Sequence, residues 1–270
     1  MAEIDIIAKT AASPITQSQI ENDLAKIGVE AGMTLVVHSS LSALGWVVGG
    51  AVAVVNALGA VLGASGTLVM PTHSGDLSDP AGWCNPPVDP GWWSIIRSEM
   101  PAFDPDRTPT RGMGAVVDCF RRGPGVVRSQ HPHVSFAASG KHAKLITADH
   151  ELESSLAERS PLARIYELQG SVLLLGIGHE SNTSLHLAES RATYPNKRFI
   201  RQGAPILIDG RRRWVEFDDL DLCSDDFPLI GAAFEGAHGI VSHRIGLAES
   251  RLLPQKTLVD FAVGWMEAHR

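Results

Sequence analysis

The 270-residue sequence is poor in cysteine, in long apolar runs and in basic charge, and each scarcity excludes a class of protein. Its three scattered cysteines are too few for a disulfide framework or a Cys-x-x-Cys metal site. The longest apolar stretch, residues 47–63, is broken by glycine and asparagine and is shorter than the roughly 20 apolar residues of a membrane-spanning helix. The net charge of −7 disfavours binding to nucleic acid or to an anionic membrane, so a cationic small molecule is the more natural partner.

The composition that is present is typical of a compact enzyme. Hydrophobic residues make up 44% of the chain, enough to bury a substantial core in a single domain over residues 1–270. The first fourteen residues carry acids early, at Glu3 and Asp5, and lack the basic region and cleavage site of a secretory signal. We therefore expect a cytoplasmic protein.

Apolar strands and glycine turns predict the fold class. Residues 34–38 and 67–70 have the pattern of strands, and a glycine turn and a helix over 51–62 separate them. This spacing is typical of a parallel strand–helix–strand unit. A further unbroken apolar run, 172–175, favours strands that are buried on both faces. We expect an α/β, three-layer sandwich-like fold with a mixed, largely parallel central sheet.

Cap and turn residues mark further elements. Residues 16–27 have the pattern of a helix, with Thr16 as its N-cap and Gly28 at its end. The pair Asp209-Gly210 lies between apolar runs and predicts a hairpin over about 206–215.

Residues 76–114 lack any regular pattern. This stretch holds seven prolines and three tryptophans, and disordered linkers are poor in such aromatics. We expect a folded, irregular excursion, with a short helix near residues 92–100, that covers a substrate site.

His186 and Glu189 form the sharpest local signal for chemistry. They are three residues apart on a predicted helix, capped by Asn182, and therefore lie on one face. A carboxylate can hold one ring nitrogen of histidine protonated and leave the other free to accept a proton. The alternative is a histidine that a helix carboxylate satisfies for structural reasons. The glycine turn just before this helix favours a site, because α/β proteins bind ligands at such junctions.

Two further histidines, His38 and His73, close predicted parallel strands at their carboxyl ends, where ligands of α/β sheets bind. No histidine pair has the spacing of a zinc-binding helix, so we expect no metal. The glycine-rich turn 45–50 is either a tight connection or a cradle of backbone N–H groups for a phosphate or a pantetheine amide.

An acidic run extends from Glu216 to Asp226. It is either a solvated edge or an anionic wall for a polyamine or an amino-sugar. A second short pattern, Leu-Ala-Glu-Ser-Arg, occurs at 187–191 and again at 247–251, where no histidine precedes it. Five residues are too few to indicate a duplication.

Longer motifs extend along most of the chain: Val37-His-Ser-Ser-Leu-Ser-Ala-Leu-Gly45, Gly49-Gly50, Gly66-Thr-Leu-Val-Met-Pro-Thr72, Asn85-Pro-Pro87 with Trp92-Trp93, Asp106-Arg-Thr-Pro-Thr-Arg-Gly-Met-Gly114, Arg128-Ser-Gln-His-Pro132, Ser160-Pro-Leu-Ala-Arg164, Leu173-Leu-Leu-Gly-Ile-Gly-His179 and Asn182-Thr-Ser-Leu-His-Leu-Ala-Glu189. Together they resemble the aminoglycoside 3-N-acetyltransferases, whose fold is unrelated to that of the common GNAT acetyltransferases. The resemblance covers about residues 27–265 and is weakest over 197–226.

The resemblance implies that acetyl-CoA donates its acetyl group directly to an amine, without an acyl-enzyme. It places the general base at His186, beside Glu189, with Asp219 as a further acidic partner. It also implies contacts to acetyl-CoA from His38, Ser39, Ser40, Leu41, Ser42, Gly49, Gly50, Ser129 and His131. For the aminoglycoside we expect contacts from Asp221, His73, Asp76 and Trp83.

The function that follows from the resemblance is N-acetylation of an aminoglycoside, at its 3-amino group, which confers resistance. One alternative is an acetyltransferase of the same family that acts on another amino-sugar position or a small amine. The other is a non-catalytic module that binds CoA or an amino-sugar. An intact His186–Glu189 pair argues against a mere binder, because binding needs no poised base.

Overall fold

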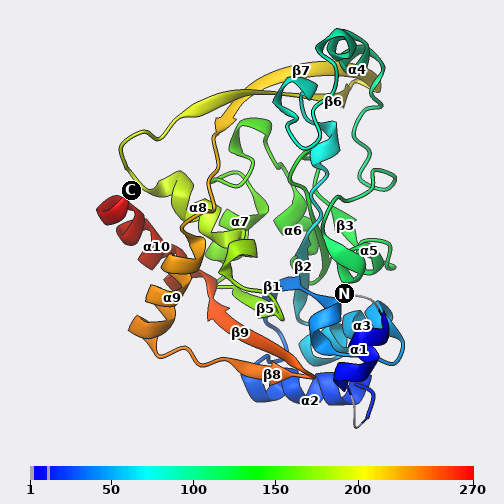
Figure 1. Cartoon of the computed structure of the whole chain (residues 1–270), viewed down its shortest axis with the longest axis vertical. Coiled ribbons are helices and arrows are strands. Elements are labelled where there is room, and N and C mark those ends of the chain that lie inside the picture. Colours follow the sequence, from blue (N-terminus) through cyan, green and yellow to red (C-terminus); the bar gives the residue numbers. More distant parts are fainter. Residues whose placement is uncertain (1–2, 11–12) are drawn as a thin grey trace.

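The computed structural model describes residues 3–10 and 13–270, and its centre is a mixed β-sheet. Within these residues the main sheet has seven strands in the order β3-β4-β2-β1-β5-β9-β8 (Figure 1). The central strands β2, β1 and β5 are parallel, and the pairs outside them are antiparallel, so that five of the seven described strands run in one direction. The predicted fold class is confirmed. The strands are β1 (Thr34–Ser39), β2 (Thr67–Pro71), β3 (Val127–Arg128), β4 (Phe136–Gly140), β5 (Ser171–Leu175), β8 (His243–Ile245) and β9 (Ala248–Pro254).

The predicted strand–helix–strand unit is present. Helix α3 (Gly50–Leu62) connects β1 to β2, and Thr34 of β1 pairs with Thr67 of β2 in parallel. The preceding helix, α2 (Gln17–Ile27), begins where the Thr16 hydroxyl accepts the N–H of Gln19 at 3.2 Å. It ends at Gly28, whose φ of 103° suits a residue without a Cβ.

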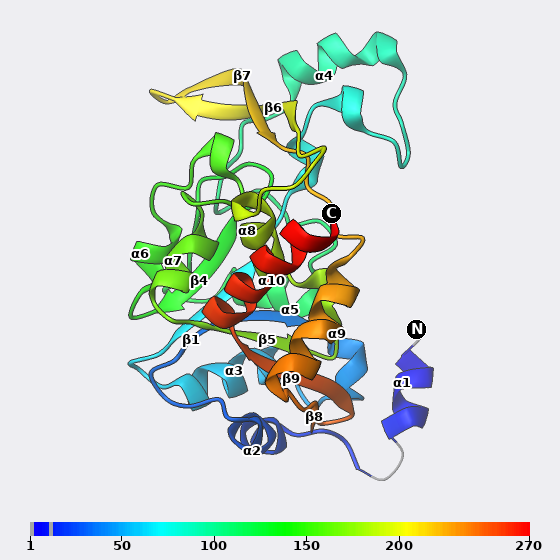
Figure 2. The same cartoon turned by 90° about the vertical axis from the view of Figure 1, so that its left-hand side faces the viewer.

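Two helical layers cover the two faces of the sheet (Figure 2). On β1, Leu35 and Val37 pack with α2, α3 and α5 (Gly114–Phe120), whereas Val36 packs on the opposite face. This alternation follows from the two-residue period of a strand, and each fully buried side chain contributes about 1.5–3 kcal/mol. The second layer consists of α6 (Ala143–Thr147), α7 (Pro161–Glu167), α8 (Ser184–Arg191), α9 (Phe227–His238) and α10 (Gln255–His269).

A long hairpin extends from the sheet, at the end of the molecule opposite α2 in both views (Figures 1 and 2). It consists of β6 (Phe199–Ile208) and β7 (Arg211–Leu220) and turns at Asp209-Gly210, as predicted. Both turn residues have positive φ, 49° and 71°, which gives the tight turn that matches the twist of the two strands.

The excursion over residues 76–114 packs against this hairpin. It contains short 3₁₀ turns and one helix, α4 (Trp93–Glu99), near the predicted position. The N–H of Phe103 donates to Pro205 O at 2.9 Å, and Arg212 Nε donates to Met100 O at 2.9 Å. The excursion is therefore folded onto the protein along part of its length.

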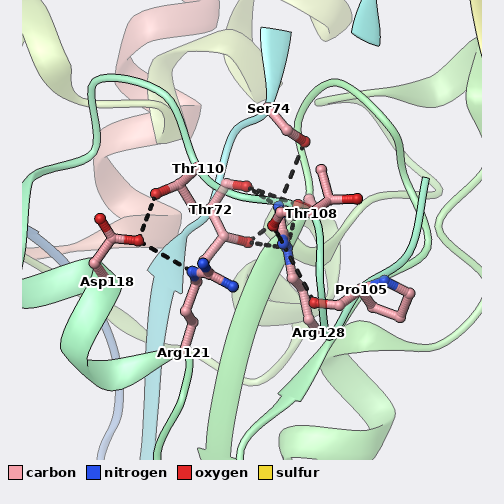
Figure 3. Close-up of polar contacts among 9 residues, drawn as sticks. Thr72, Ser74, Pro105, Thr108, Thr110, Asp118, Arg121 and Arg128 are labelled. Atoms are coloured by element: carbon pink, nitrogen blue, oxygen red, sulfur yellow. Dashed lines mark hydrogen bonds and ion pairs between the residues drawn. The ribbon is translucent and has the colours of Figure 1, made fainter. Parts of the chain in front are cut away.

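Arg128 ties the base of the excursion to the sheet (Figure 3). Its Nη1 donates to Thr108 O at 2.5 Å and its Nη2 to Thr72 O at 2.7 Å. Its Nε donates to Ser135 Oγ at 2.9 Å. One planar guanidinium with five N–H groups thus joins the excursion, the end of β2 and the segment before β4.

Helix α1 (Glu3–Thr10) lies beside the turn that precedes α3. The backbone N–H of Trp46 donates to Thr10 Oγ1 at 2.7 Å, and the Trp46 indole donates to Glu3 at 3.3 Å. No helix in the described part of the chain is long and apolar enough to cross a membrane.

Candidate active site

The structure brings His186 and Glu189 together on α8. The imidazole Nδ1 lies 2.7 Å from Glu189 Oε2, Glu189 is fully buried, and the side chain of His186 is 14% exposed. A carboxylate can only accept, so Nδ1 carries the proton and Nε2 is left as an acceptor. The ring of Phe227 packs on the imidazole, with 4.7 Å between the two ring centres, and limits the rotation of the imidazole.

The second oxygen of Glu189 is also fixed in place. Oε1 accepts from Arg270 Nη1 at 2.7 Å and from the backbone N–H of Cys223 at 3.0 Å. Three donors hold this buried carboxylate in one orientation. Arg270 was not predicted from the sequence, because it is 81 residues from Glu189 and no local pattern links them.

Three histidines from separate elements line one cavity of about 260 Å³, which we call the histidine cavity. His38 lies in β1, His73 follows β2, and His186 lies on α8. The two strands are parallel neighbours, so their carboxyl ends meet at one edge of the sheet, as expected. Glu180, Asn182 and Thr183, which no motif had assigned to a substrate, complete this part of the wall.

Two histidines of this cavity, His38 and His73, are neutral at physiological pH. Burial lowers the pKa of His38 to about 4. Burial, with smaller contributions from nearby His38 and His186, lowers the pKa of His73 to about 3. The cavity therefore does not repel a cationic amine through these two rings.

Buried polar groups of this cavity point to a ligand. His73 Nε2 is buried and has no hydrogen-bond partner among the described residues. His38 Nε2 lies 3.3 Å from the hydroxyl of Thr183, at the start of α8. A buried polar atom without a partner costs about 1–3 kcal/mol, so the nitrogen of His73 fits a site that a ligand completes.

A larger cavity of about 790 Å³, which we call the glycine cavity, adjoins the first. The two share Ser39, Gly112, Met113 and Ile177 in their walls, so that they lie side by side. Six of the residues that the resemblance assigned to acetyl-CoA line the glycine cavity: Ser39, Ser40, Leu41, Ser42, Gly49 and Gly50. His38 lies next to them in the wall of the histidine cavity.

Gly49 caps the start of α3 and Gly50 is its first residue, and both line the glycine cavity. Both have positive φ, 81° and 56°, and a Cβ on Gly50 would meet no atom of the described chain within 4 Å. No side chain among the residues that the structure describes caps this helix end. Its first N–H groups and its helix dipole therefore suit a phosphate or an amide oxygen.

Ser129 and His131 lie apart from these cavities, fully buried. Ser129 Oγ lies 2.9 Å from His150 Nδ1 and also accepts the N–H of Phe136. His131 Nδ1 accepts the N–H groups of His133 and Val134, each at 3.1 Å. Their polar atoms hold a loop in shape, and contact with acetyl-CoA stays a prediction for both.

Two other predicted acidic residues, Asp219 as a further partner of His186 and Asp221 as a substrate contact, bond to groups other than the imidazole. Asp219 accepts the N–H of Leu220 at 2.9 Å, and burial raises the pKa of Asp219, against opposing hydrogen bonds and the nearby His186 ring. Asp221 pairs with Arg198, Oδ2 to Nη2 at 2.6 Å, in the wall of a separate cavity. The carboxylate in direct contact with the imidazole is that of Glu189.

The two substrate residues predicted in the excursion contact other parts of it. Asp76 forms an exposed ion pair with Arg111, and the indole of Trp83 donates to Ser78 Oγ at 2.9 Å. On this side the histidine cavity is bounded by Gly112 and Met113. Contact of Asp76 or Trp83 with a substrate stays a prediction. Among residues 3–10 and 13–270, no group of three or more His, Cys, Asp or Glu is arranged to hold a metal ion.

A family model described as aminoglycoside 3-N-acetyltransferase matches residues 36–267. The chain is 46% identical over 260 residues to the SPbeta prophage-derived aminoglycoside N(3')-acetyltransferase-like protein YokD of Bacillus subtilis, covering 96% of this chain and 95% of that protein.

Solved structures agree with the sequence comparison. The crystal structure of YokD superposes with a TM-score of 0.95 at 45% identity, covering 98% of each chain. The enzyme AAC-VIa bound to sisomicin matches with a TM-score of 0.87 at 31% identity, covering 96% of this chain and 99% of that one. AAC-IIIb in a binary complex with CoASH matches with a TM-score of 0.85 at 32% identity, covering 95% of this chain and 97% of that one.

Proposed function

This chain belongs to the aminoglycoside 3-N-acetyltransferase family, and from that premise we propose that it transfers an acetyl group from acetyl-CoA directly to the 3-amino group of an aminoglycoside, with His186 as general base. Such a modification confers resistance to the antibiotic. The observation that carries the proposal is the fixed imidazole, whose Nδ1 is held by buried Glu189 in the wall of a cavity.

The reaction needs a group that removes a proton from the amine. An aminoglycoside amine is largely an ammonium ion at neutral pH, and it must lose a proton before its lone pair can form the new N–C bond. His186 accepts that proton at Nε2, and Glu189 stabilises the resulting imidazolium. Acetyl-CoA supplies a thioester, whose C–S bond breaks as the N–C bond forms. The nitrogen bonded to the acetyl group still carries one proton too many, and this proton passes to the thiolate that leaves, giving CoASH. The proton held by His186 is released to solvent, which restores the base.

The glycine cavity is the proposed place for acetyl-CoA. Ser39 to Ser42 and the N–H groups at the start of α3 offer hydrogen bonds to pantetheine amides and phosphates. Support comes from the CoASH complex of the relative AAC-IIIb. Since Ser39 borders both cavities, a thioester held there can reach His186.

The proposed aminoglycoside site begins at the histidine cavity and extends outward past His73. Its substrate carries several ammonium groups, which fits the net charge of −7 and the carboxylate of Glu180 in the cavity wall. The sisomicin complex of AAC-VIa supports a substrate of this class. Asp221, Asp76 and Trp83 are proposed to contact the outer part of the substrate.

One assay tests the function. Thiol release from acetyl-CoA is measured with a panel of aminoglycosides and simple amines, and the acetylated position is determined by NMR. We expect release with aminoglycosides and acetylation at the 3-amino group. A different acetylated position, or activity on other amines alone, would overturn the stated substrate and favour the alternative within the family. Binding of both ligands without thiol release would instead indicate a non-catalytic module.

A second experiment tests the place of acetyl-CoA with matched glycine variants. Gly50 and Gly63 lie at opposite ends of α3 and both have positive φ, 56° and 62°, so Gly50→Val and Gly63→Val each introduce backbone strain. We expect calorimetry to show weaker acetyl-CoA binding for Gly50→Val alone, because its new side chain enters the glycine cavity. Equal affinity in the two variants would exclude this end of α3 from the coenzyme site.

A further inference from the structure

Arg270 contacts the oxygen of Glu189 that His186 does not use. Its Nη1 lies 2.7 Å from Glu189 Oε1, while His186 Nδ1 lies 2.7 Å from Oε2. The Glu189 carboxylate is shielded from water, because its side chain is 0% exposed and that of Arg270 is only 12% exposed. One negative charge is therefore shared between a permanent cation and an imidazole.

Arg270 is itself held in one orientation. Two of its nitrogens bind Asp226 at 2.7 Å each, Nη2 also donates to Cys223 O at 3.0 Å, and its guanidinium lies 5.0 Å from the Tyr194 ring centre. Burial alone would lower the pKa of Arg270, but hydrogen bonds to Asp226 and Glu189 outweigh it and raise that pKa above its ordinary value. The positive charge beside Glu189 is thus permanent.

We propose that Arg270 is a positioning residue that aims the Glu189 carboxylate at His186 and limits how strongly that carboxylate holds a proton on the imidazole. The inference rests on the proposed function for His186. A buried carboxylate next to histidine favours the imidazolium, and an imidazolium cannot act as a base. Arg270 neutralises part of that carboxylate charge and so weakens the attraction of Glu189 for a proton on the imidazole.

Other titratable groups also face this pair, from each element packed around it. Those near the His186 ring or the Glu189 carboxylate are His38 of β1, His73 after β2, Glu180 before α8, Asp219 of β7, Tyr194 and Lys197 after α8, and Cys223 and Asp226 before α9. Both neighbouring histidines are neutral, as described above. Arg270 is the described cationic side chain that forms an ion pair with Glu189.

The test compares Arg270→Met with Arg270→Lys and with a matched control, Arg251→Met. Arg251 pairs with Glu235, which in turn contacts His179, in an arrangement that does not line the histidine cavity. In Arg270→Met we expect the acid limb of kcat/KM to move to higher pH by on the order of one unit, which is about a tenfold loss on that limb. Arg270→Lys keeps the positive charge, so its acid limb moves less than that of Arg270→Met. A lysine cannot reproduce the several N–H contacts of the planar guanidinium, so we expect kcat to fall. Arg251→Met leaves the acid limb in place.

An NMR titration provides a readout that does not require turnover. The ring resonance of His186 is assigned by its loss in His186→Gln, and its pH midpoint is compared among the variants. We expect a higher midpoint in Arg270→Met than in the wild type, and no such change when Glu189→Gln is already present, because the effect passes through that carboxylate. A midpoint and an acid limb unchanged in both Arg270 variants would overturn the inference. A raised midpoint in a protein that acetylates no aminoglycoside would leave the inference standing and overturn the proposed function instead.

Discussion

Two His–Glu–Arg sets, both within the described residues, share their contact chemistry and differ in their surroundings. In the first, Glu189 lies 2.7 Å from His186 and 2.7 Å from Arg270. In the second, Glu235 lies 2.9 Å from His179 and 2.6 Å from Arg251. These distances alone cannot distinguish a reactive set from a structural one.

The difference lies in the free nitrogen of the imidazole. His179 uses Nε2 for Glu235 and lies 3.4 Å from Asn182 Nδ2 through Nδ1, and its ring packs directly on Gly231 of α9. His186 uses Nδ1 for Glu189 and lines the histidine cavity. A carboxylate-bound histidine can therefore accept a proton from a substrate where its second nitrogen remains available beside a cavity. The second set instead fixes packing between α9, β9 and the turn before α8.

The largest effect that separates the two sets is expected in turnover. His186→Gln removes the proposed base and should lower kcat by on the order of 10²–10⁴-fold. His179→Gln should leave kcat per folded molecule near the wild-type value, because its ring faces no substrate. Thiol release at saturating acetyl-CoA, corrected for folded fraction, measures both. Similar losses in the two variants would remove the functional distinction between the sets.

The next effect concerns stability and uses two glycines of the same helix. A Cβ on Gly231 would lie 2.1 Å from His179 Cγ, so Gly231→Ala should displace that ring and cost about 1–3 kcal/mol. At Gly236, also on α9, such a Cβ would meet no atom of the described residues within 4 Å, and Gly236→Ala should stabilise the helix by about 0.5–1 kcal/mol. Urea unfolding measures both free energies. A stable Gly231→Ala protein would show that the second set does not depend on close packing.

The smallest effect concerns the acid sensitivity of the second set. Burial lowers the pKa of His179 below its ordinary value of 6.5, although the hydrogen bond to Glu235 opposes the shift. The unfolded chain then binds a proton that the folded protein excludes. This contribution to stability is complete above pH 6.5 and is lost as the pH falls through the lowered pKa. Between these limits the unfolding free energy of the wild type should fall more steeply with decreasing pH than that of His179→Gln, by up to about 1.4 kcal/mol per pH unit. Parallel curves from urea titrations at several pH values would contradict the assignment.

Local signals predicted the parts of the fold and site that depend on neighbouring residues. Thr16 and Gly28 marked the ends of α2, and Asp209-Gly210 marked the turn of the long hairpin. His186 and Glu189 could be paired from the sequence because residues three apart on a helix share a face. In each case the physical cause lies within a few residues of its effect.

The repeated Leu-Ala-Glu-Ser-Arg pattern shows that a short local sequence does not determine its own secondary structure. Its first copy lies in α8 and supplies Glu189 to one set, whereas Ala248 to Arg251 of the second copy lie in β9 and supply Arg251 to the other. In β9, Arg251 pairs with Leu174 and Ser250 with Leu175 of β5, so tertiary pairing overrides the intrinsic preference of the five residues.

Contacts between distant segments were beyond prediction for the same reason. Arg270 reaches Glu189 across 81 residues, and the burial of Ser129 and His131 depends on the loop that folds around them. No spacing rule in the sequence describes which side chains meet once helices and strands are packed. The fold class followed from patterning, whereas long-range partners such as Arg270 depend on how the helices and strands pack together.

The attachment of the excursion by Arg128 has a consequence for how this site can change. The acceptors at Pro105 and Thr108 are main-chain oxygens, and those near the sheet are Thr72 O and hydroxyl groups. Every amino acid carries such a carbonyl, so the attachment depends on the path of the chain and on no particular side chain there. It also involves no carboxylate, and so it is insensitive to acid titration and weakly screened by salt. The outward side chains of the excursion, which we propose contact the substrate, can therefore change while the position of the excursion over the protein is retained.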